Sequence, residues 1–440
     1  MHDITQGKLP MGKILLLATV LYSGTITFVS ATEAGILKVG VVKTDITPRT
    51  LTDMNPMGGD FKKVHDPINM RTLLVENGKN KVAIISLDVI EVGDMVPVRK
   101  RIERELHIPF SNIMIVATHD HSAPRVGHVS PGALAHEGTE TSNTWTNWLY
   151  DQMITSLKQA QEKAVPARFG VAKGDVDVNI NRDAYSSGKW DIGYNAKGPS
   201  DKGIWVMKFE NLAGQPIAIL SNYAVHSVVS IGIKQVSGDL AGFASNYVEK
   251  QFGDSVVSLF TLSSVADQNP RIFNPSQKDT NPNDAEFAWR AIDAQGTMVG
   301  NEIVRVANNI HDMTGDVKIV AQEKVVSCPA QQGTDVMSNM NQKKVDNVDL
   351  RLGLIMLNNT ALTGVSGEVV TNIAYHLAEK SPLTNTILVS IANDRVGYIP
   401  DDEAYGRPIF AVKGSPFAQG CAENAIVDNL SSMISATIKK

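Results

Sequence analysis

The stretch Ile113-Met114-Ile115-Val116-Ala117-Thr118-His119-Asp120-His121-Ser122 passes from five apolar residues directly into a polar cluster that holds two histidines. A short run rich in β-branched residues is typical of a buried strand, so the polar cluster is expected at the strand's carboxyl end. In open α/β sheets, ligands and reacting groups gather at that edge. Side chains two positions apart in an extended segment point to the same side, so His119 and His121 are expected to face one cavity. The pattern predicts a metal-dependent hydrolase.

Strands and helices are predicted to alternate along the rest of the chain. The Asn77-Gly78 pair between two apolar runs predicts a β-hairpin, which argues against a purely parallel barrel. Strands are predicted at residues 37–42, 71–76, 81–88, 113–117, 204–211, 216–226, 256–262, 317–326, 352–357 and 386–392. Helices are predicted at residues 95–107, 144–163, 241–252, 283–312 and 422–438, the fourth broken or bent near Gly296 or Gly300. This order predicts an α/β fold whose core is a mixed β-sheet, or two packed sheets, flanked by helices.

Composition excludes some classes of partner. The chain has 440 residues, and its 41 basic and 46 acidic side chains give a net charge of −5. This balance lacks the electrostatic footprint of a nucleic-acid-binding protein, and no basic run indicates binding to an anionic membrane surface. No linker rich in proline, glycine and serine divides the sequence, so residues 32–440 are predicted to form a single domain.

Residues 1–31 have the pattern of a secretory signal peptide. Lys13 precedes a short apolar segment at residues 14–22, and Val29-Ser30-Ala31 offers small residues for cleavage. Met11 is an alternative start. The other interpretation is a membrane anchor that stays attached, but the apolar segment is short for a span of about 20 residues. We therefore predict export to the periplasm or the cell exterior, with no stable transmembrane segment after cleavage.

The chain contains two cysteines, Cys328 and Cys421. They are too far apart in sequence to form a metal-binding motif, and in an oxidising compartment they could pair. The sequence leaves open whether they form a disulfide.

Three more polar residues follow apolar runs, as the histidine pair does. These are His226, Glu368 and Tyr398. Together with His119 they would give two imidazoles, a carboxylate and a phenolate, a set suited to zinc with one position left for water. Each residue also has an ordinary explanation, because such a histidine, glutamate or tyrosine is often a cap, a solvated loop group or a packing group. The sequence alone does not show that the four positions converge.

A wider pattern connects these sites. Residues 118–124, Thr-His-Asp-His-Ser-Ala-Pro, resemble the Thr-His-Thr-His-Ser-Gly-Pro signature of the neutral/alkaline non-lysosomal ceramidase family, in its amino-terminal catalytic domain. Further blocks resemble that family in the same order: Val39-Gly40, Asp45-Ile46-Thr47-Pro48, His65-Asp66-Pro67-Ile68 with Arg71, Ser86-Leu87-Asp88, Asn181-Arg182, residues 222–226, Ser237-Gly238-Asp239, residues 266–270, Gly367-Glu368 and Gly397-Tyr398. The resemblance runs from about Leu37 to the end of the chain.

The resemblance implies zinc held by His119, His226, Glu368 and Tyr398. It places His121 beside the metal, where an imidazole would transfer a proton or bind a developing oxyanion. The set implies zinc, although nitrogen and oxygen donors would also accept manganese or iron.

The same resemblance gives roles to further residues. It implies that Arg182 supplies a fixed cation for a substrate oxygen. It makes Asp88, Asp239 and Asp267 candidates to orient the histidines through their free ring nitrogens. The alternative for these three aspartates is duty at strand ends or as helix caps.

Three departures from the family pattern bear on the substrate. Asn269, in the candidate catalytic set, stands where family ceramidases carry a serine essential for activity. Ala123 and Arg125 replace the glycine-rich end of the signature, and Arg125 would suit a polar or anionic substrate better than two long alkyl chains. The chain also ends where the family's carboxyl-terminal immunoglobulin-like domain would begin.

We therefore predict an exported zinc hydrolase that cleaves the carboxamide of a small-molecule or lipid-like N-acyl substrate, with ceramide itself in doubt. One alternative is an esterase or lactonase on the same site, because a metal-activated water attacks esters more readily than amides. The other alternative is a non-catalytic binding protein of the same fold. The sequence does not indicate the oligomeric state.

Overall fold

The computed structural model describes residues 36–134, 137–253, 255–331 and 345–439, which belong to one compact unit. The predicted signal segment, residues 1–31, lies outside the described residues. Within the described part of the chain, no helix is both long enough and apolar enough to cross a membrane.

The larger sheet has eight strands in the order β12-β10-β9-β6-β1-β3-β4-β5. Its strands are β1 (Leu37–Asp45), β3 (Asn69–Asn77), β4 (Asn80–Leu87), β5 (Ile113–Ala117), β6 (Val165–Asp175), β9 (Gly203–Asn211), β10 (Pro216–Tyr223) and β12 (Val257–Leu262). The pairs β4–β5 and β10–β12 are parallel, and the other neighbours are antiparallel. The sheet is therefore mixed, as the hairpin at Asn77-Gly78 predicts.

A second sheet of four strands packs on the first. Its order is β14-β15-β16-β18, with bounds β14 (Ile319–Pro329), β15 (Asn347–Leu357), β16 (Thr360–Val365) and β18 (Asn385–Val389). Short ladders pair β2 (Lys63–Val64) with β11 (Gln235–Val236), β13 (Gln268–Pro270) with β7 (Asn179–Ser186) and β8 (Lys189–Asn195), and β17 (Glu368–Val369) with β19 (Tyr398–Ile399).

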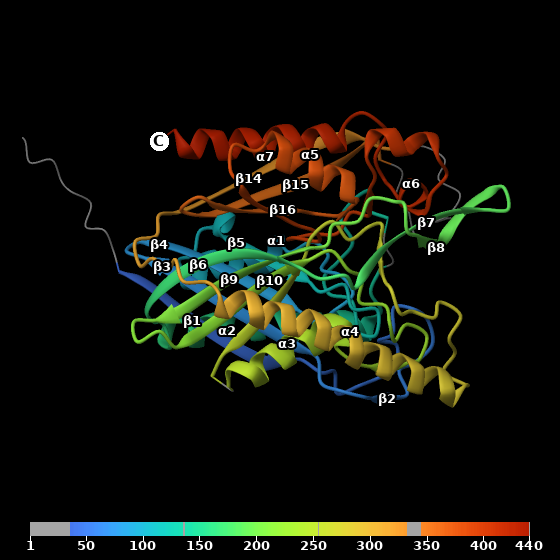
Figure 1. The fold of residues 1–440 in the computed structure, drawn as a ribbon, viewed down its shortest axis with the longest axis horizontal. Helices are drawn as coiled ribbons and strands as arrows, with labels where there is room; N and C mark the ends of the chain where they lie inside the picture. Colours follow the sequence, from blue (N-terminus) through green and yellow to red (C-terminus); the bar gives the residue numbers. More distant parts are fainter. Residues whose placement is uncertain (1–35, 135–136, 254, 332–344, 440) are drawn as a thin grey trace, which may run out of the picture. The chain divides into compact units, whose positions relative to one another are not determined.

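Helices cover the outer faces of both sheets (Figure 1). Along the larger sheet lie α1 (Val96–Leu106), α2 (Glu140–Glu162), α3 (Asp239–Phe252) and α4 (Pro282–Asn308), and along the smaller sheet lie α5 (Thr371–Lys380) and α7 (Ala422–Ile438). Short helical turns occur at Phe110–Asn112, Asp402–Gly406 and α6 (Phe410–Lys413). The expected α/β fold with two packed sheets flanked by helices is confirmed.

Strand periodicity explains the layers. On β3, Leu73 and Val75 belong to the apolar cluster between the two sheets, whereas Met70 and Leu74 belong to the cluster under the helices. Alternation of this kind places successive side chains on opposite faces, so both faces of β3 are buried. Each fully buried aliphatic side chain contributes roughly 1.5–3 kcal/mol, which makes these two apolar layers the main source of stability.

The predicted break in the fourth helix is wrong. Helix α4 runs without interruption through Gly296 and Gly300, and it ends at Asn308. A Cβ atom at Gly296 would lie 2.4 Å from the ring of Phe243, and one at Gly300 would lie 2.5 Å from the ring of Tyr247. Both rings belong to α3, so the glycines allow close approach of two helices and do not interrupt one.

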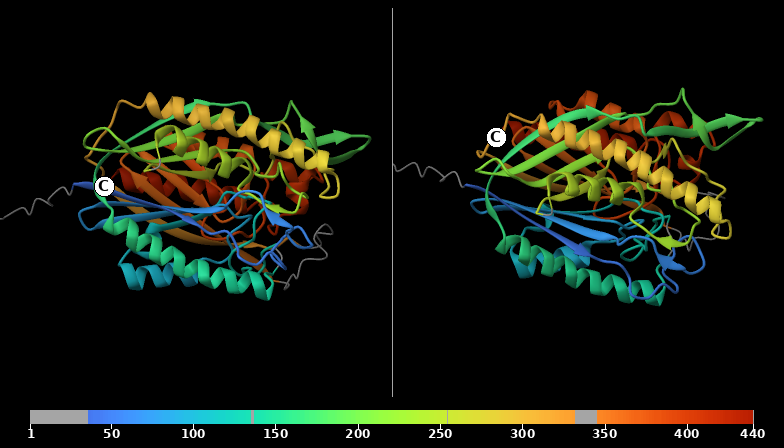
Figure 2. Two further views of the ribbon diagram at one scale, coloured as in Figure 1. Left: turned by 90° about the horizontal axis from the view of Figure 1, so that it is seen from below. Right: turned by 60° about the horizontal axis from the view of Figure 1, so that its bottom comes forward.

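The sequence analysis missed strand β6 and the hairpin β7–β8. The hairpin projects beyond the packed sheets (Figure 2), and its strand β8 has no fully buried residue. Without an apolar alternation to bury, such a hairpin leaves a weak pattern in sequence. Its turn at Ser187-Gly188 has two positive φ angles, as a tight hairpin turn requires.

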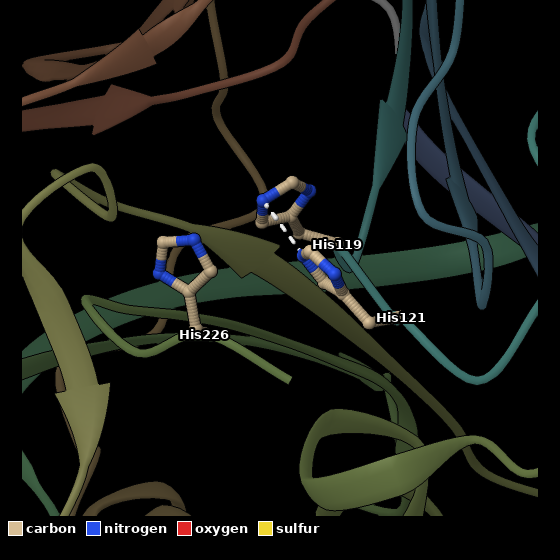
Figure 3. Close-up of side chains that lie close together, drawn as sticks. All are labelled: His119, His121 and His226. Carbon is tan, nitrogen blue, oxygen red and sulfur yellow. Dashed lines mark hydrogen bonds between the residues drawn. The ribbon is translucent and has the colours of Figure 1, made fainter. Parts of the chain in front are cut away.

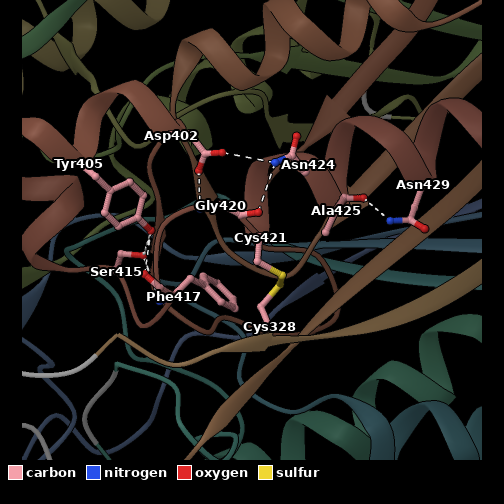
Figure 4. The surroundings of a disulfide bond; sticks show 10 residues. All are labelled: Cys328, Asp402, Tyr405, Ser415, Phe417, Gly420, Cys421, Asn424, Ala425 and Asn429. Atoms are coloured by element: carbon pink, nitrogen blue, oxygen red, sulfur yellow. Dashed lines mark hydrogen bonds between the residues drawn. A yellow bond between two sulfur atoms is a disulfide. The ribbon is translucent and has the colours of Figure 1, made fainter.

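The two cysteines are paired (Figure 4). The disulfide joins Cys328, near the end of β14, to Cys421, the residue before α7. It therefore fixes the start of the last helix to the smaller sheet, and it resolves the alternative that the sequence left open.

Candidate metal centre

The two histidines of the predicted cluster come together through a turn, so the expected extended segment is wrong. Strand β5 ends at Ala117, and His119 has a φ of 58° in the left-handed region. A β-carbon makes this conformation costly, so it persists only where the surroundings hold it. Here the backbone N–H of Asp120 donates to the carbonyl of Val89 at 3.0 Å, and that of His121 donates to Ser227 at 3.0 Å. The turn brings the two imidazoles edge to face, with ring centroids 4.6 Å apart (Figure 3).

His226 enters the same space from another part of the larger sheet. It lies three residues beyond the end of β10 and is fully buried. Its ring centroid is 4.7 Å from that of His119, and the ligand-type atoms of His119, His121 and His226 all lie within 4.8 Å of one another. Three imidazoles from two segments therefore converge at one point.

Glu368 reaches this point from the smaller sheet. It begins β17, one residue pair of a short parallel ladder in which it stands in register with Tyr398 of β19. Its Oε2 atom lies 3.1 Å from Nε2 of His119 and 3.4 Å from Nε2 of His226. Its Oε1 atom accepts hydrogen bonds from Arg395 at 2.7 and 3.2 Å, so one oxygen is anchored and the other faces the histidines.

Backbone carbonyls fix which ring nitrogens are free. Nδ1 of His119 lies 2.6 Å from the carbonyl of Ile90, and Nδ1 of His226 lies 3.0 Å from that of Gln268. A carbonyl can only accept, so each Nδ1 carries the proton and each Nε2 of a neutral ring presents a lone pair. These contacts also show that the prediction of aspartates orienting the two rings is wrong.

The three aspartates stabilise neighbouring backbone instead. Asp88 pairs with Arg71 at 2.9 Å, and Asp239 accepts from the backbone and hydroxyl of Ser230 at 2.7 and 2.6 Å. Asp267 accepts from Thr371 at 2.8 and 3.1 Å. The alternative given for them, support of strand and helix ends, is the one that the contacts favour.

The donor atoms of the cluster fit a cation. Burial and the nearby Arg182 lower the pKa of His226 to about 3, so its ring is neutral at ordinary pH. Burial opposes ionisation of Glu368, but the charge of Arg395, 2.7 Å from Oε1, helps to hold the pKa of this carboxyl well below its usual range. Two imidazole lone pairs then face a carboxylate oxygen that is buried and has no hydrogen-bond partner among the described residues. Such an arrangement repels itself unless a positive ion lies between the atoms, and it is the donor set that zinc prefers.

Tyr398 and Arg182 form the adjacent wall. The guanidinium of Arg182 lies 5.6 Å from the ring centre of Tyr398, and its Nη1 atom lies 3.3 Å from Nε2 of His226 and 3.4 Å from Oδ1 of Asn269. Burial, together with the charge of Glu368, raises the pKa of Tyr398 to about 12. The phenol therefore stays protonated at neutral pH unless a cation binds its oxygen.

A cavity of about 540 Å³ opens onto these groups. Its wall includes His119, His121, Arg182, Asn269 and Tyr398 from the predicted set. It also includes four further charged side chains, Glu91, Arg125, Asp191 and Arg395, and the apolar side chains Ile90, Ile192, Val228, Ile231, Phe273 and Phe410. His226 and Glu368 are not in its lining, but Glu368 contacts His119 and His226 contacts Arg182, both of which are.

Arg395 is a residue of the candidate site that was not predicted from the sequence. It is 7% exposed and holds Glu368, and its Nε atom also lies 3.2 Å from Oε2 of Glu91. It stands three residues before Tyr398, in the apolar run from which Tyr398 was selected. The charge of Arg395 within an apolar run could have indicated its role, because an arginine that is buried is almost always paired with an acidic side chain.

Comparisons with known proteins identify the family to which the chain is similar. The family model for the neutral/alkaline non-lysosomal ceramidase amino-terminal domain matches residues 37–288. Neutral ceramidases B and A of Dictyostelium discoideum are each 26% identical over 186 residues, about 40% of this chain, and the matched part is 26% of the length of either relative.

Solved structures show the same fold. The crystal structure of neutral ceramidase from Pseudomonas aeruginosa superposes with a TM-score of 0.74 at 16% identity, covering 91% of this chain and 75% of that one. A ceramidase complexed with C2 gives a TM-score of 0.72 at 15% identity, covering 92% and 76%. The family match spans more than half of the sequence and the fold agrees over nine tenths of it, so the chain belongs to the neutral/alkaline non-lysosomal ceramidase family and has its hydrolase fold.

Proposed function

We propose that the protein is an exported zinc-dependent amidohydrolase that cleaves the carboxamide of an N-acyl compound, with ceramide itself not the substrate. The observation that carries this proposal is the meeting of three lone-pair donors, Nε2 of His119, Nε2 of His226 and Oε2 of Glu368, around one point beside a cavity. Tyr398, in register with Glu368, is proposed as the fourth ligand.

A zinc ion at this point would supply Lewis acidity, polarising a carbonyl and lowering the pKa of a bound water to about 7. The residues of the chain divide the remaining work. Arg395 and the carbonyls of Ile90 and Gln268 keep the ligands in place before any substrate arrives. Preorganised donors of this kind require no rearrangement during the reaction.

His121 is proposed to move the proton. Burial, and the neighbouring His119 and His226, hold the pKa of His121 well below its ordinary value, so the ring is neutral and able to accept. In the hydrolysis, water adds its oxygen to the acyl carbon, the C–N bond breaks, and the leaving nitrogen takes up a proton. An imidazole beside the metal point can take that proton from water and deliver it to the amine.

Arg182 is proposed to bind the substrate's carbonyl oxygen. Its side chain is 4% exposed, and its Nε and Nη2 atoms have no hydrogen-bond partner among the described residues. Buried donors without partners are costly, so they favour a ligand atom at this position. Asn269, next to Arg182, offers an amide where family ceramidases carry the essential serine, which is why a substrate other than ceramide is proposed.

The first test is metal removal. Purified protein should contain about one zinc per chain, lose hydrolysis of N-acyl substrates on chelation, and regain it with zinc. A His226→Ala variant should lack zinc, whereas His376→Ala, which changes an exposed histidine paired with Glu423, should keep it. Hydrolysis that survives complete zinc removal would refute the proposal.

The second test concerns the bond that is cleaved. The ligand set alone does not distinguish amides from esters, so matched N-acyl and O-acyl substrates should be compared side by side. Cleavage of the ester alone would identify an esterase or lactonase. Full zinc occupancy without turnover of either class would identify a binding protein.

Export is part of the proposal and has its own test. Cleavage after Ala31 would give a mature protein that begins at Thr32. Amino-terminal sequencing of protein recovered outside the cytoplasm should find that start, and an intact first segment would indicate a retained anchor.

A further inference from the structure

Arg125, whose charge suits a polar or anionic substrate, forms part of the wall of the metal-centre cavity. It lies in the segment after β5, is 9% exposed, and its Nη1 atom is 3.4 Å from Oε1 of Glu91. Glu91 also receives Arg395 on its other oxygen, at 3.2 Å. A chain of alternating charges therefore runs from Glu368 through Arg395 and Glu91 to Arg125, and it holds the last guanidinium at the cavity wall.

The charges around the cavity leave it positive. Three guanidinium groups, those of Arg125, Arg182 and Arg395, stand against the buried carboxylates of Glu91 and Glu368. The other acidic residue on the wall, Asp191, is at the exposed hairpin and pairs with Lys189 at 3.0 Å. A divalent cation at the histidines would add to this excess, and in a partly buried site such an excess attracts an anion.

Apolar side chains line the cavity from different segments. Val228 and Ile231 follow β10, and Phe273 and Pro275 follow β13. None of these belongs to the segment that carries Arg125. A substrate with an apolar chain and an acidic group can therefore place each against a wall of its own kind.

Beside Arg125 there is further space. A neighbouring cavity of about 390 Å³ shares Pro56, Met57 and Arg125 with the metal-centre cavity. Its other lining residues come from the loop at 53–58 and from residues 137–142, and the carboxylates of Asp53 and Glu137 are among them. Arg125 therefore stands between the two cavities, and an acidic group can reach it from the side of the metal-centre cavity, away from those two carboxylates.

We propose that Arg125 binds an acidic group on the amine part of the substrate, so that the enzyme prefers N-acyl amino acids and other acidic N-acyl amines. This inference rests on the proposed amidohydrolase function. The acyl chain binds against the apolar segments of the cavity wall, so the acidic group that contacts Arg125 belongs to the amine part of the substrate. Hydrolysis of such an amide consumes one water, breaks the C–N bond, and yields a fatty carboxylate and a free amino acid or aminosulfonate.

The test compares three substrates that share one acyl chain. N-lauroylglycine carries a carboxylate, N-lauroyltaurine a sulfonate, and N-lauroylglycinamide is the neutral match of the first. For the wild-type protein, kcat/KM should be about 10- to 100-fold higher for an acidic substrate than for the glycinamide, as expected for a charge-assisted hydrogen bond. The first two substrates show which acid is preferred.

Variants then assign the preference to Arg125. Arg125→Gln should reduce the ratio of acidic to neutral kcat/KM to near one, and Arg125→Lys should restore part of it. Arg168→Gln, which removes an arginine paired with Glu210 outside the cavity wall, should leave the ratio unchanged. Because the ratio is measured within each variant, a general loss through Glu91 and Arg395 cancels. An unchanged ratio in Arg125→Gln would overturn the inference.

A binding measurement separates this inference from the proposed function. Titration calorimetry of metal-free protein with N-lauroylglycine and N-lauroylglycinamide should show tighter binding of the acid, lost in Arg125→Gln. If no substrate is hydrolysed but this preference is found, the amidohydrolase function fails and the acid site stands. If all three are hydrolysed equally, the function stands and the acid site is refuted.

Discussion

Arg71 and Arg182 are both buried arginines, and they differ in how their nitrogen atoms are used. Arg71 is 1% exposed, and its three nitrogens contact Asp88, Glu249 and Asn246 at 2.8–2.9 Å. Arg182 is 4% exposed, yet two of its three nitrogens have no hydrogen-bond partner among the described residues. The fold therefore supplies a hydrogen-bond partner for every nitrogen of the Arg71 guanidinium. The free nitrogens of Arg182 would gain partners only from a bound ligand.

The same contrast separates the two carboxylates of these regions. Glu249 binds Arg71 and Lys43 with its two oxygens, whereas Glu368 binds Arg395 with one oxygen and turns the other toward two imidazole lone pairs. Unpaired buried polar atoms destabilise a fold by about 1–3 kcal/mol each, so the unpaired atoms of Arg182 and Glu368 beside one cavity favour a ligand there. Burial of a charge alone does not distinguish Arg182 from Arg71, whereas the number of hydrogen-bond partners of the guanidinium does.

The largest effect on activity is expected from a substitution at the candidate metal centre. Glu368→Gln keeps the size of the side chain but replaces the free carboxylate oxygen by an amide. Activity on N-acyl substrates should fall at least about 1,000-fold, since loss of a ligand removes the activated water. Steady-state kinetics and zinc analysis check this, with Glu286→Gln, at an exposed ion pair with Arg290 on α4, as the control. Retention of both zinc and activity would remove Glu368 from the ligand set.

A substitution of Arg71 should lower the stability of the fold and leave the catalytic activity unchanged. Arg71→Met leaves Asp88 and Glu249 buried without their partner, and we expect the free energy of unfolding to fall by about 3–5 kcal/mol. Denaturant titration measures this, with Arg101→Met at an exposed helix pair as the control. Activity per folded molecule should change little. A stability equal to wild type would show that the pairing is dispensable.

Arg182→Met should give the opposite result. Because the fold satisfies few of its hydrogen-bond donors, its loss should leave the free energy of unfolding within about 1 kcal/mol of wild type. Loss of a donor to the substrate oxygen should lower kcat/KM about 100-fold. Chemical denaturation and kinetics on the same preparation test both statements. A variant that is strongly destabilised would place Arg182 with Arg71.

The smallest effect is a pH dependence. The pKa of His226 is about 3 in the folded protein, below the ordinary value of 6.5, so an unfolded chain takes up a proton that the folded chain refuses. The contribution of His226 is fully present above about pH 6.5 and is lost as the pH falls toward 3. Between pH 6.5 and 5, metal-free protein should lose about 2 kcal/mol more than a His226→Gln variant does. Identical slopes for the two proteins would contradict this.

Much of the fold was accessible from sequence because apolar periodicity and turn residues control it. The final helix was predicted at residues 422–438, the bounds that α7 has. The break predicted at Gly296 was wrong, because the sequence does not distinguish a glycine that permits close packing of two helices from one that interrupts a helix. The hairpin β7–β8 was not predicted because the buried residues of β7 are mostly polar and β8 has no buried residue, so neither strand shows an apolar alternation.

The candidate site was partly accessible for a different reason. Polar residues at the ends of apolar runs predicted that His119, His226 and Glu368 would matter, and the structure brings these three together. The path that His119 takes was not predictable, since its left-handed backbone depends on contacts with Val89 and Ser227 from other segments. Arg395 was missed for a related reason, because its role exists only through a carboxylate 27 positions away.

The proposed ligand atoms come from both layers of the molecule: the histidines follow strands of the eight-stranded sheet, and the glutamate precedes a helix that packs on the four-stranded one. A metal ion held between these atoms would cross-link the two layers. Its binding energy would then add to the contacts between the two layers, and the melting temperature would rise with the logarithm of free zinc.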